Sequence, residues 1–495
     1  MLFIIVALIA ILACIIINYF IRKFFSFEAL NKLPGPVRLP LVGTSYIFLQ
    51  QKSQDFLDII MLICKKYSSP FQFWMGPQLI IVIYEPNEVQ TVLKSRLCLD
   101  KSMVYKVLEP IFGSGIASAP AHIWTGHRKM IAPIFKTVNL RKFVDIFVEE
   151  ASMLTEELEK VEHNENEIFF LKPLEKCALK IACGTMIGIK VEENILDKTV
   201  EAFERMKEII RARFRNPFLI PDFIFNLTSM GKMQREILIF VQSFIDKMIQ
   251  QWANESNTTN VNDSKAHKRL VDILMNSTDK EFIEKDIFYN LFTMLVTASD
   301  TTAVTMYFVI FMLANFPEIQ EKVYKELLEI YGTQTPKAAP VKYEDLQHMN
   351  YLERVIKETL RIFPTVPIIA RQVTEDFKIG DIVLPKHTDI LIPFIQMHRN
   401  KKYWPNPLVF DPDRFLPENI KNYHLFYFTP FSDGPRNCIG MRYGMMSMKA
   451  ILATLIRSFI FKVNETIEID KIKLNMDIVL STLEPVKIKL KKRNP

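Results

Sequence analysis

A long apolar stretch between Ile287 and Asn315 limits the folds open to this chain. It contains a single charged residue, Asp300, in 29 residues. A run of this length suits a membrane-spanning helix, and it equally suits a central helix buried on all sides in a large core. Polar residues between Thr297 and Thr302 interrupt the run, and a carboxylate at the bilayer centre costs about 2.5–3.5 kcal/mol on insertion scales. We therefore expect a buried central helix.

The rest of the chain indicates a mainly α protein with minor β structure. Short alternating segments appear only late, as in Phe377–Leu384 and Asp389–Pro393, so the sheet is expected to be small and late in the chain. Two polar, aperiodic stretches predict surface loops, namely Trp252–Lys268 and Tyr331–Val341.

The N-terminal segment predicts a membrane anchor. Met1–Ile21 carries no charge and would form about 31 Å of helix, and Arg22 and Lys23 follow at once. A cleaved signal peptide would have a basic start and a small-residue cleavage site. We therefore predict a transmembrane signal-anchor over residues 1–21, a basic and Pro-rich hinge over 22–36, and a catalytic domain over 37–495. The positive-inside rule puts that domain on the cytoplasmic side.

Charge and cysteine content exclude several classes of protein. The 62 Lys and Arg against 55 Asp and Glu give a net charge of +7, too mild and dispersed for a nucleic-acid-binding protein. That charge is compatible with an acidic protein partner or an anionic membrane. The six cysteines form no CxxC pair, so we expect free thiols rather than a zinc ribbon or a disulfide framework.

The strongest local motif surrounds Cys438. In FSDGPRNCIG, residues 431–440, Gly434-Pro435 predicts a tight turn, and an apolar, helix-like run from Met445 to Phe459 follows. A thiolate at a helix N-terminus is stabilised by backbone N–H groups and the helix dipole, which suits a metal ligand. A buried structural cysteine is the alternative that Cys438 alone leaves open.

These residues resemble the haem-binding signature FxxGxRxCxG of the cytochrome P450 superfamily. Further motifs of that family follow in its order: WTGHR at 124–128, SDTT at 299–302, ETLR at 358–361 and PDRF at 412–415. Residues 367–399 are most similar to family 4, the branch related to fatty-acid ω-hydroxylases, as found in insects. The resemblance implies the cytochrome P450 fold preceded by one N-terminal transmembrane helix.

The resemblance also implies haem b and the residues that hold it. Cys438 would be the axial thiolate ligand of the iron and its only protein metal ligand, with Phe431 beside the sulfur and Gly440 permitting close approach. The expected partners of the haem propionates are Trp124, Arg128, Arg371 and Arg436.

Two other groups carry family roles. Asp300 and Thr301 would supply protons during oxygen activation. Glu358, Arg361 and Arg414 would form a buried structural triad, in which losing one member costs about 3–5 kcal/mol.

One position departs from the branch. Fatty-acid hydroxylases of family 4 commonly have Glu, which esterifies a haem methyl group, where this chain has Thr297. We therefore expect haem held without a covalent bond apart from the Cys438 thiolate–iron bond. Strictly terminal hydroxylation no longer follows from the resemblance.

The implied activity is that of a haem-thiolate monooxygenase at the endoplasmic reticulum membrane. It would insert one oxygen atom from O2 into a fatty acid, a hormone-like lipid or a xenobiotic. Electrons would come from NADPH through NADPH-cytochrome P450 reductase, with cytochrome b5 as a further donor. The expected contact residues of the reductase are Arg128, Lys129, Arg442 and Lys449.

The substrate pocket is expected at Val366–Ile369 and in the loop from Lys101 to Ile123. Phe214–Phe225 is expected to line the entrance and to dip into the membrane. Two alternatives remain. One is a haem-thiolate isomerase or dehydratase, which needs neither O2 nor reductase, and the other is a non-catalytic haem carrier. The Asp300–Thr301 pair favours the monooxygenase, and dependence of turnover on NADPH distinguishes the three.

Overall fold

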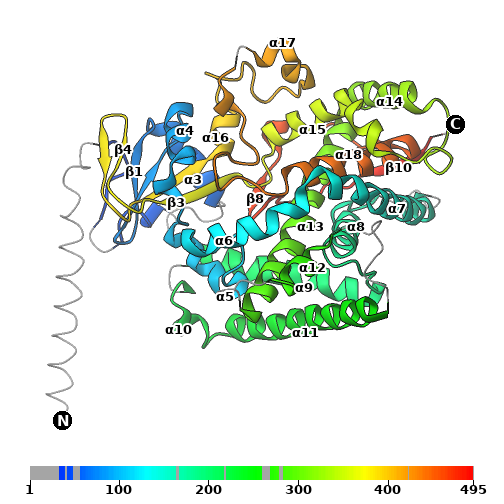
Figure 1. Cartoon of the computed structure of the whole chain (residues 1–495). Coiled ribbons are helices and arrows are strands. Elements are labelled where there is room, and N and C mark those ends of the chain that lie inside the picture. The colour runs from blue at the N-terminus through cyan, green and yellow to red at the C-terminus, as the bar shows by residue number, and fades with distance from the viewer. Residues whose placement is uncertain are drawn as a thin grey trace, which may run out of the picture.

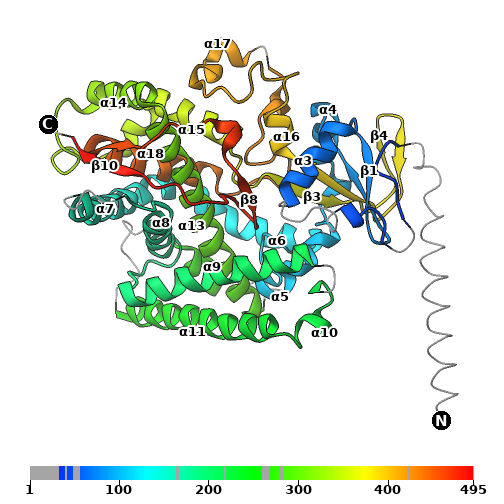
Figure 2. The same ribbon diagram turned by 180° about the vertical axis from the view of Figure 1, so that it is seen from behind.

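The computed structural model describes residues 33–39, 42–47, 56–162, 167–216, 219–258, 268–277, 283–421 and 423–493. The predicted anchor, residues 1–21, and the first part of the hinge lie outside these ranges. The described chain is mainly helical with a small amount of strand, as predicted. The main sheet lies at one end of the molecule, and the rest is mostly helical (Figures 1 and 2).

The long apolar stretch forms the central helix α13 (Glu284–Asn315), which runs through the middle of the helical region (Figure 1). Among the described residues it is the one helix long and apolar enough to span a membrane, but 78% of its most apolar window is buried inside the protein. The prediction of a core helix is confirmed. α8 (Leu171–Met186) makes the most extensive contact with it.

The bounds of the other helices are α3 Phe56–Lys66, α4 Pro86–Lys94, α5 Glu109–Phe112, α6 Ala121–Ile131, α7 Thr137–Glu162, α9 Glu193–Arg215, α10 Asp222–Phe225, α11 Ser229–Thr258, α12 Leu270–Met275, α14 Pro317–Tyr331, α15 Asn350–Ile362, α16 Phe394–His398, α17 Pro417–Ile420 and α18 Met441–Ser458. Not all of these helices pack on α13, since α3 and α4 lie beside the main sheet (Figures 1 and 2).

The main sheet has the order β1-β2-β6-β3. β1 (Phe71–Met75) and β2 (Gln78–Val82) form an antiparallel hairpin, and β2 pairs in parallel with β6 (Asp389–Pro393). β3 (Ile368–Gln372) completes the sheet on the other side of β6. The prediction that strands come only late in the chain is therefore wrong, because the first two strands come from an early hairpin.

Three two-stranded sheets complete the β structure. They are β4 (Phe377–Ile379) with β5 (Ile382–Leu384), β7 (Phe459–Lys462) with β10 (Lys489–Lys492), and β8 (Leu474–Met476) with β9 (Leu480–Thr482).

One predicted loop is confirmed and the other is partly wrong. α14 ends at Tyr331, where Gly332 has a φ of 62°, and irregular chain follows. The stretch from Trp252, in contrast, stays helical to the end of α11 at Thr258. The indole N–H of Trp252 donates to Asp272 at 2.8 Å, and this contact anchors the extra helical turns.

Candidate haem site

The loop around Cys438 is shaped by backbone hydrogen bonds. The N–H of Cys438 donates to the carbonyl of Phe431 at 2.9 Å, and the N–H of Asn437 donates to that of Gly434 at 3.2 Å. Gly434 has a φ of 74°, and a Cβ there would lie 1.9 Å from the carbonyl oxygen of Leu93, so only glycine fits. The loop leads directly into α18, and Cys438 therefore lies just before a helix N-terminus.

The thiol of Cys438 faces a cavity between α13 and α18. The side chain is exposed, and the cavity that it lines has an empty volume of about 1220 Å³. Phe431 and Gly440 line the same cavity. The thiol is open to the cavity but lies deep within the protein, and the resulting desolvation raises the pKa of Cys438, while the N–H of Gly440 and the guanidinium of Arg128 oppose that shift.

Three cations, Lys101, Arg371 and Arg436, line this cavity. None forms an ion pair with another described residue, and the Nε of Arg436 is buried without a hydrogen-bond partner. Burial, followed by repulsion from Arg371, lowers the pKa of Arg436 to about 9. Burial and repulsion from both arginines lower that of Lys101. Because uncompensated buried charge is costly, the cavity is suited to a ligand with carboxylates.

This donor set fits a haem. A thiol on one side and three cations at the rim match an iron-porphyrin with two propionates. Trp124 does not line the cavity itself, but its ring centroid lies 5.2 Å from the Arg436 guanidinium. The sequence analysis missed Lys101 as a member of this set. Its loop position carried no motif, and only the tertiary structure brings it next to Arg371 and Arg436.

Arg128 was expected to bind a haem propionate, but its guanidinium contacts Asn437 instead. Its guanidinium donates to the Asn437 carbonyl at 2.9 Å and to the Asn437 Oδ1 at 2.7 Å. It therefore braces the Cys438 loop from α6.

Asp300 and Thr301 lie on different faces of α13. Thr301 lines the cavity, as do Thr297 and Thr305 at the same helical spacing. The Thr301 hydroxyl donates to the Thr297 carbonyl at 2.7 Å. Asp300 instead faces α8 and α9, where its carboxylate lies 2.9 Å from the Nζ of Lys207. The expected acid–alcohol pair is therefore separated by the helix.

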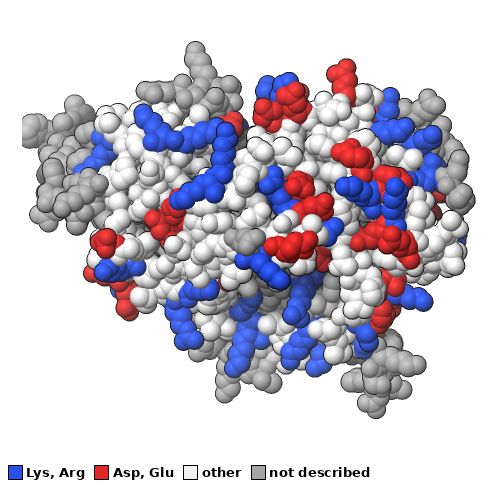
Figure 3. All heavy atoms as spheres, turned by 90° about the horizontal axis from the view of Figure 1, so that it is seen from above, with Lys and Arg blue, Asp and Glu red and all other residues white. Residues whose placement is uncertain are grey.

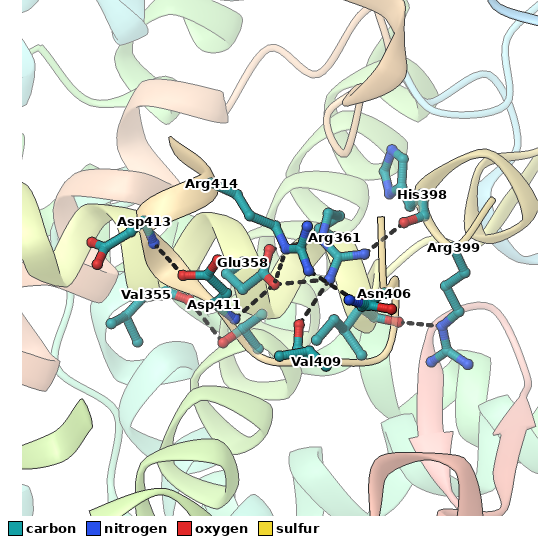
Figure 4. A network of polar contacts seen from close by, with 12 residues as sticks. Val355, Glu358, Arg361, His398, Arg399, Asn406, Val409, Asp411, Asp413 and Arg414 are labelled. Atoms are coloured by element: carbon teal, nitrogen blue, oxygen red, sulfur yellow. Dashed lines mark hydrogen bonds and ion pairs between the residues drawn. The ribbon is translucent and has the colours of Figure 1, made fainter. Parts of the chain in front are cut away.

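Glu358, Arg361 and Arg414 come together as expected, and all are buried (Figure 4). Both carboxylate oxygens of Glu358 accept from Arg361, at 2.7 and 2.8 Å, and the Nε of Arg414 lies 3.4 Å from Glu358 Oε1. The N–H of Asp411 donates to the same oxygen at 3.0 Å. The network joins α15 to the short 3₁₀ helix η7 (Pro412–Phe415).

A second, apolar pocket adjoins the cavity. Val366 and Ile369 line both spaces, and Ile368 lines the apolar pocket, whereas Pro367 lines neither. The other apolar lining residues include Phe73, Val104, Leu108, Phe214, Met476 and Ile478. Three charged residues also line it: Arg211 pairs with Asp477 at 2.8 Å, and Arg215 donates to the Asn475 Oδ1 at 3.3 Å. This space suits a lipophilic molecule that reaches the cavity between Val366 and Ile369.

The proposed reductase contacts need one correction. Lys129 and Arg442 are exposed, but Lys449 is 6% exposed and donates to the Leu346 carbonyl at 2.8 Å. Its ammonium also pairs with Glu353, so it cannot contact a partner protein. Basic side chains still gather along the lower edge of Figure 3, which is the front of the molecule in Figure 1, where α6 runs.

Comparisons with known proteins agree with this geometry. The family model described as Cytochrome P450 matches residues 33–491. The chain is 33% identical to "Cytochrome P450 4c21" of Blattella germanica, over 94% of each chain. It is 33% identical to human "Cytochrome P450 4V2", over 94% of this chain and 91% of that one. It is 29% identical to "Cytochrome P450 4g15" of Drosophila melanogaster, over 94% and 92%. The chain therefore belongs to the cytochrome P450 family of haem-thiolate monooxygenases, and these relatives are members of its family 4.

Proposed function

We propose that this chain is a membrane-anchored enzyme of the endoplasmic reticulum that inserts one oxygen atom from O2 into a lipophilic substrate. Electrons would come from NADPH-cytochrome P450 reductase, with cytochrome b5 as a further donor. The observation that carries the proposal is the apolar pocket that meets the Cys438 cavity at Val366 and Ile369. A lining that is mostly apolar favours fatty acids, hormone-like lipids or apolar xenobiotics over polar substrates.

Haem, when bound, supplies the redox centre at which O2 is reduced and one of its oxygen atoms is transferred. Cys438 would hold the iron, and Lys101, Arg371 and Arg436 would hold the propionates. Trp124 packs against the guanidinium of Arg436, and Arg128 keeps the Cys438 loop in place. Thr301, on the cavity face of α13, passes protons that Asp300 receives from the other face.

Reconstitution with reductase tests the function. We expect type I spectral changes with apolar members of a lipid and xenobiotic panel, and product formation that requires both NADPH and reductase. Product formed from a lipid peroxide without NADPH would instead establish an isomerase or dehydratase. Haem binding with no turnover under either condition would establish a carrier.

Two variants test the residues. Cys438→Ala should lose the red-shifted Soret band of the ferrous carbonyl complex, whereas Cys64→Ala, which removes a buried thiol on α3 outside the cavity lining, should keep it. Thr301→Ala should keep haem and substrate binding but release more hydrogen peroxide and less product per NADPH. Unchanged coupling would remove Thr301 from proton delivery.

A further inference from the structure

Asp300 belongs to a buried charged cluster on the face of α13 opposite the haem cavity. The Nζ of Lys207 lies 2.9 Å from Asp300 Oδ1 and 3.2 Å from Glu175 Oε1, and it also pairs with Glu204. One oxygen from each of the three carboxylates lies within 4.8 Å of the others. Glu175 comes from α8, Glu204 and Lys207 from α9, and Asp300 from α13, so three elements build the cluster.

The cluster holds more acid groups than its cation neutralises. One ammonium faces three carboxylates, and Arg211 is a further cation that influences Glu204. Two like charges in a buried site favour retention of a proton. Burial, opposed by Lys207 and assisted by Glu204 and Asp300, raises the pKa of Glu175 to about 9. Lys207 already occupies the place of a metal ion among the carboxylates.

The cluster also connects solvent to Asp300. The Glu204 side chain is 46% exposed, whereas those of Glu175 and Asp300 are 9% and 12% exposed. A small cavity lies between them and is lined by all four charged residues of the cluster. Burial alone would raise the pKa of Glu204, but Lys207 and a hydrogen bond from Glu175 hold it below its usual value. A charged outer carboxylate therefore adjoins a protonated inner one.

We propose that Glu204, Glu175 and Lys207 form the proton entrance of this enzyme. The proposal rests on the proposed function, in which transfer of one oxygen atom and release of the other as water consumes two electrons and two protons. The reductase supplies the electrons and solvent supplies the protons. The O–H bond of Glu175 breaks as one forms on Asp300, and Glu204 reprotonates Glu175 from solvent.

The ion pair with Lys207 accounts for how the Asp300 carboxyl would carry a proton from the cluster to Thr301. While it is charged, Asp300 stays bound to Lys207 on the far face of α13. Protonation removes that attraction, so the side chain is released towards the neighbouring Thr301 on the cavity face. Lys207 is thus a positioning residue, and it returns Asp300 to the cluster once the proton has left.

Glutamine variants in the reconstituted full-length enzyme test the entrance. Glu175→Gln and Glu204→Gln keep size and polarity but cannot carry a proton. Each should lower kcat about 10-fold or more and raise the solvent deuterium isotope effect, with haem content and substrate Kd unchanged. Glu204→Asp should recover most of the rate. Glu201→Gln, on the same helix with a 59% exposed side chain paired to Arg205, is the control and should behave as wild type.

Several outcomes would overturn the entrance without affecting the proposed function. One is wild-type kcat and isotope effect in both glutamine variants. Another is a fall in kcat accompanied by lost haem or weakened substrate binding at an unchanged isotope effect, which indicates a structural role. If Glu175→Gln does not fold, Glu204→Gln decides alone, because its side chain lies at the solvent edge. A wild-type enzyme without NADPH-dependent product would refute the proposed function itself.

Discussion

The three cations of the haem cavity form a site suited to a ligand with negatively charged groups. Lys101, Arg371 and Arg436 lie close enough that repulsion adds to burial in lowering the pKa of Lys101 and Arg436. Such an arrangement opposes folding in isolation and is relieved by carboxylates. We therefore expect haem propionates, bound at these cations, to help hold this part of the protein together.

Lys101→Met should weaken haem retention. It removes one of three cations while keeping the length and apolar stem of the side chain. A charge-assisted hydrogen bond contributes about 1.5–3 kcal/mol, so haem transfer to apomyoglobin should be roughly 10-fold faster or more. Lys106→Met, at an exposed lysine of the same loop, is the matched control. Equal transfer rates for the two variants would remove Lys101 from the haem site.

Because Thr297 cannot form an ester with a haem methyl group, we expect that solvent can extract the haem. Its hydroxyl donates to the Thr293 carbonyl at 2.7 Å, and its side chain lines the cavity. The nearest carboxylate on the helix, Asp300, faces Lys207 and cannot reach the ring. Acidic organic solvent should remove haem from the wild type after turnover. Thr297→Glu should retain part of it, whereas Thr297→Gln, of equal length, should retain none. Retention by the wild type would contradict the argument.

A local sequence motif can be enough to predict where a single residue lies in the fold. Cys438 lies at the start of α18 because its turn and the following helix are encoded within 30 consecutive residues, 430–459. Lys101 and Lys449 show the limit. Proximity of Lys101 to Arg436 arises only in the tertiary structure, and a lysine on α18 reveals neither its buried face nor its partner Glu353.

Among the elements, α13 could be predicted from local sequence, whereas the pairing of the first strands arises only in the tertiary structure. A helix apolar on all sides needs burial on all sides, so composition alone predicted α13. β2 instead pairs with β6 through Ile80–Asp389 and Val82–Leu391, and such a pairing has no local pattern. The early hairpin was missed for this reason, although its short apolar segments are typical of buried strands.

The triad that joins α15 to η7 predicts a large loss of stability on Glu358→Gln. The carboxylate is fully buried between Arg361 and Arg414. Removing its charge leaves two buried guanidinium groups unpaired, which costs about 3–5 kcal/mol in the free energy of unfolding. Urea unfolding followed by far-UV circular dichroism measures this cost.

Glu236→Gln is the control for the triad. It breaks an exposed i,i+4 contact with Lys232, where the expected loss is about 0.3–0.5 kcal/mol. A loss of this size at Glu358 as well would mean that the triad does not hold α15 and η7 together.

At the scale of the whole molecule, one end of the described chain exposes apolar side chains. α10 and the main sheet lie towards the same end in both views, away from the C-terminus (Figures 1 and 2). Near α10, Phe223 is 74% exposed and Leu227 is 87% exposed. Fully burying such a side chain contributes about 1.5–3 kcal/mol, so a lipid surface would stabilise both. We therefore expect α10 to enter the bilayer beside the predicted N-terminal anchor, with the substrate pocket opening nearby through Phe214.

Tryptophan substitutions in the full-length chain test this orientation. Phe223→Trp and Leu227→Trp place an indole on the proposed membrane face, where the ring favours the interface between lipid and water. In vesicles that contain brominated lipids, the fluorescence added by each substitution should be quenched. Val138→Trp, at an equally exposed apolar position (72%) at the start of α7, should add fluorescence that is not quenched. If the Phe223→Trp signal is as insensitive to bromine as that of Val138→Trp, α10 lies in water. The substrate entrance would then have to face solvent, and apolar substrates would reach the haem cavity from the aqueous phase rather than from the membrane.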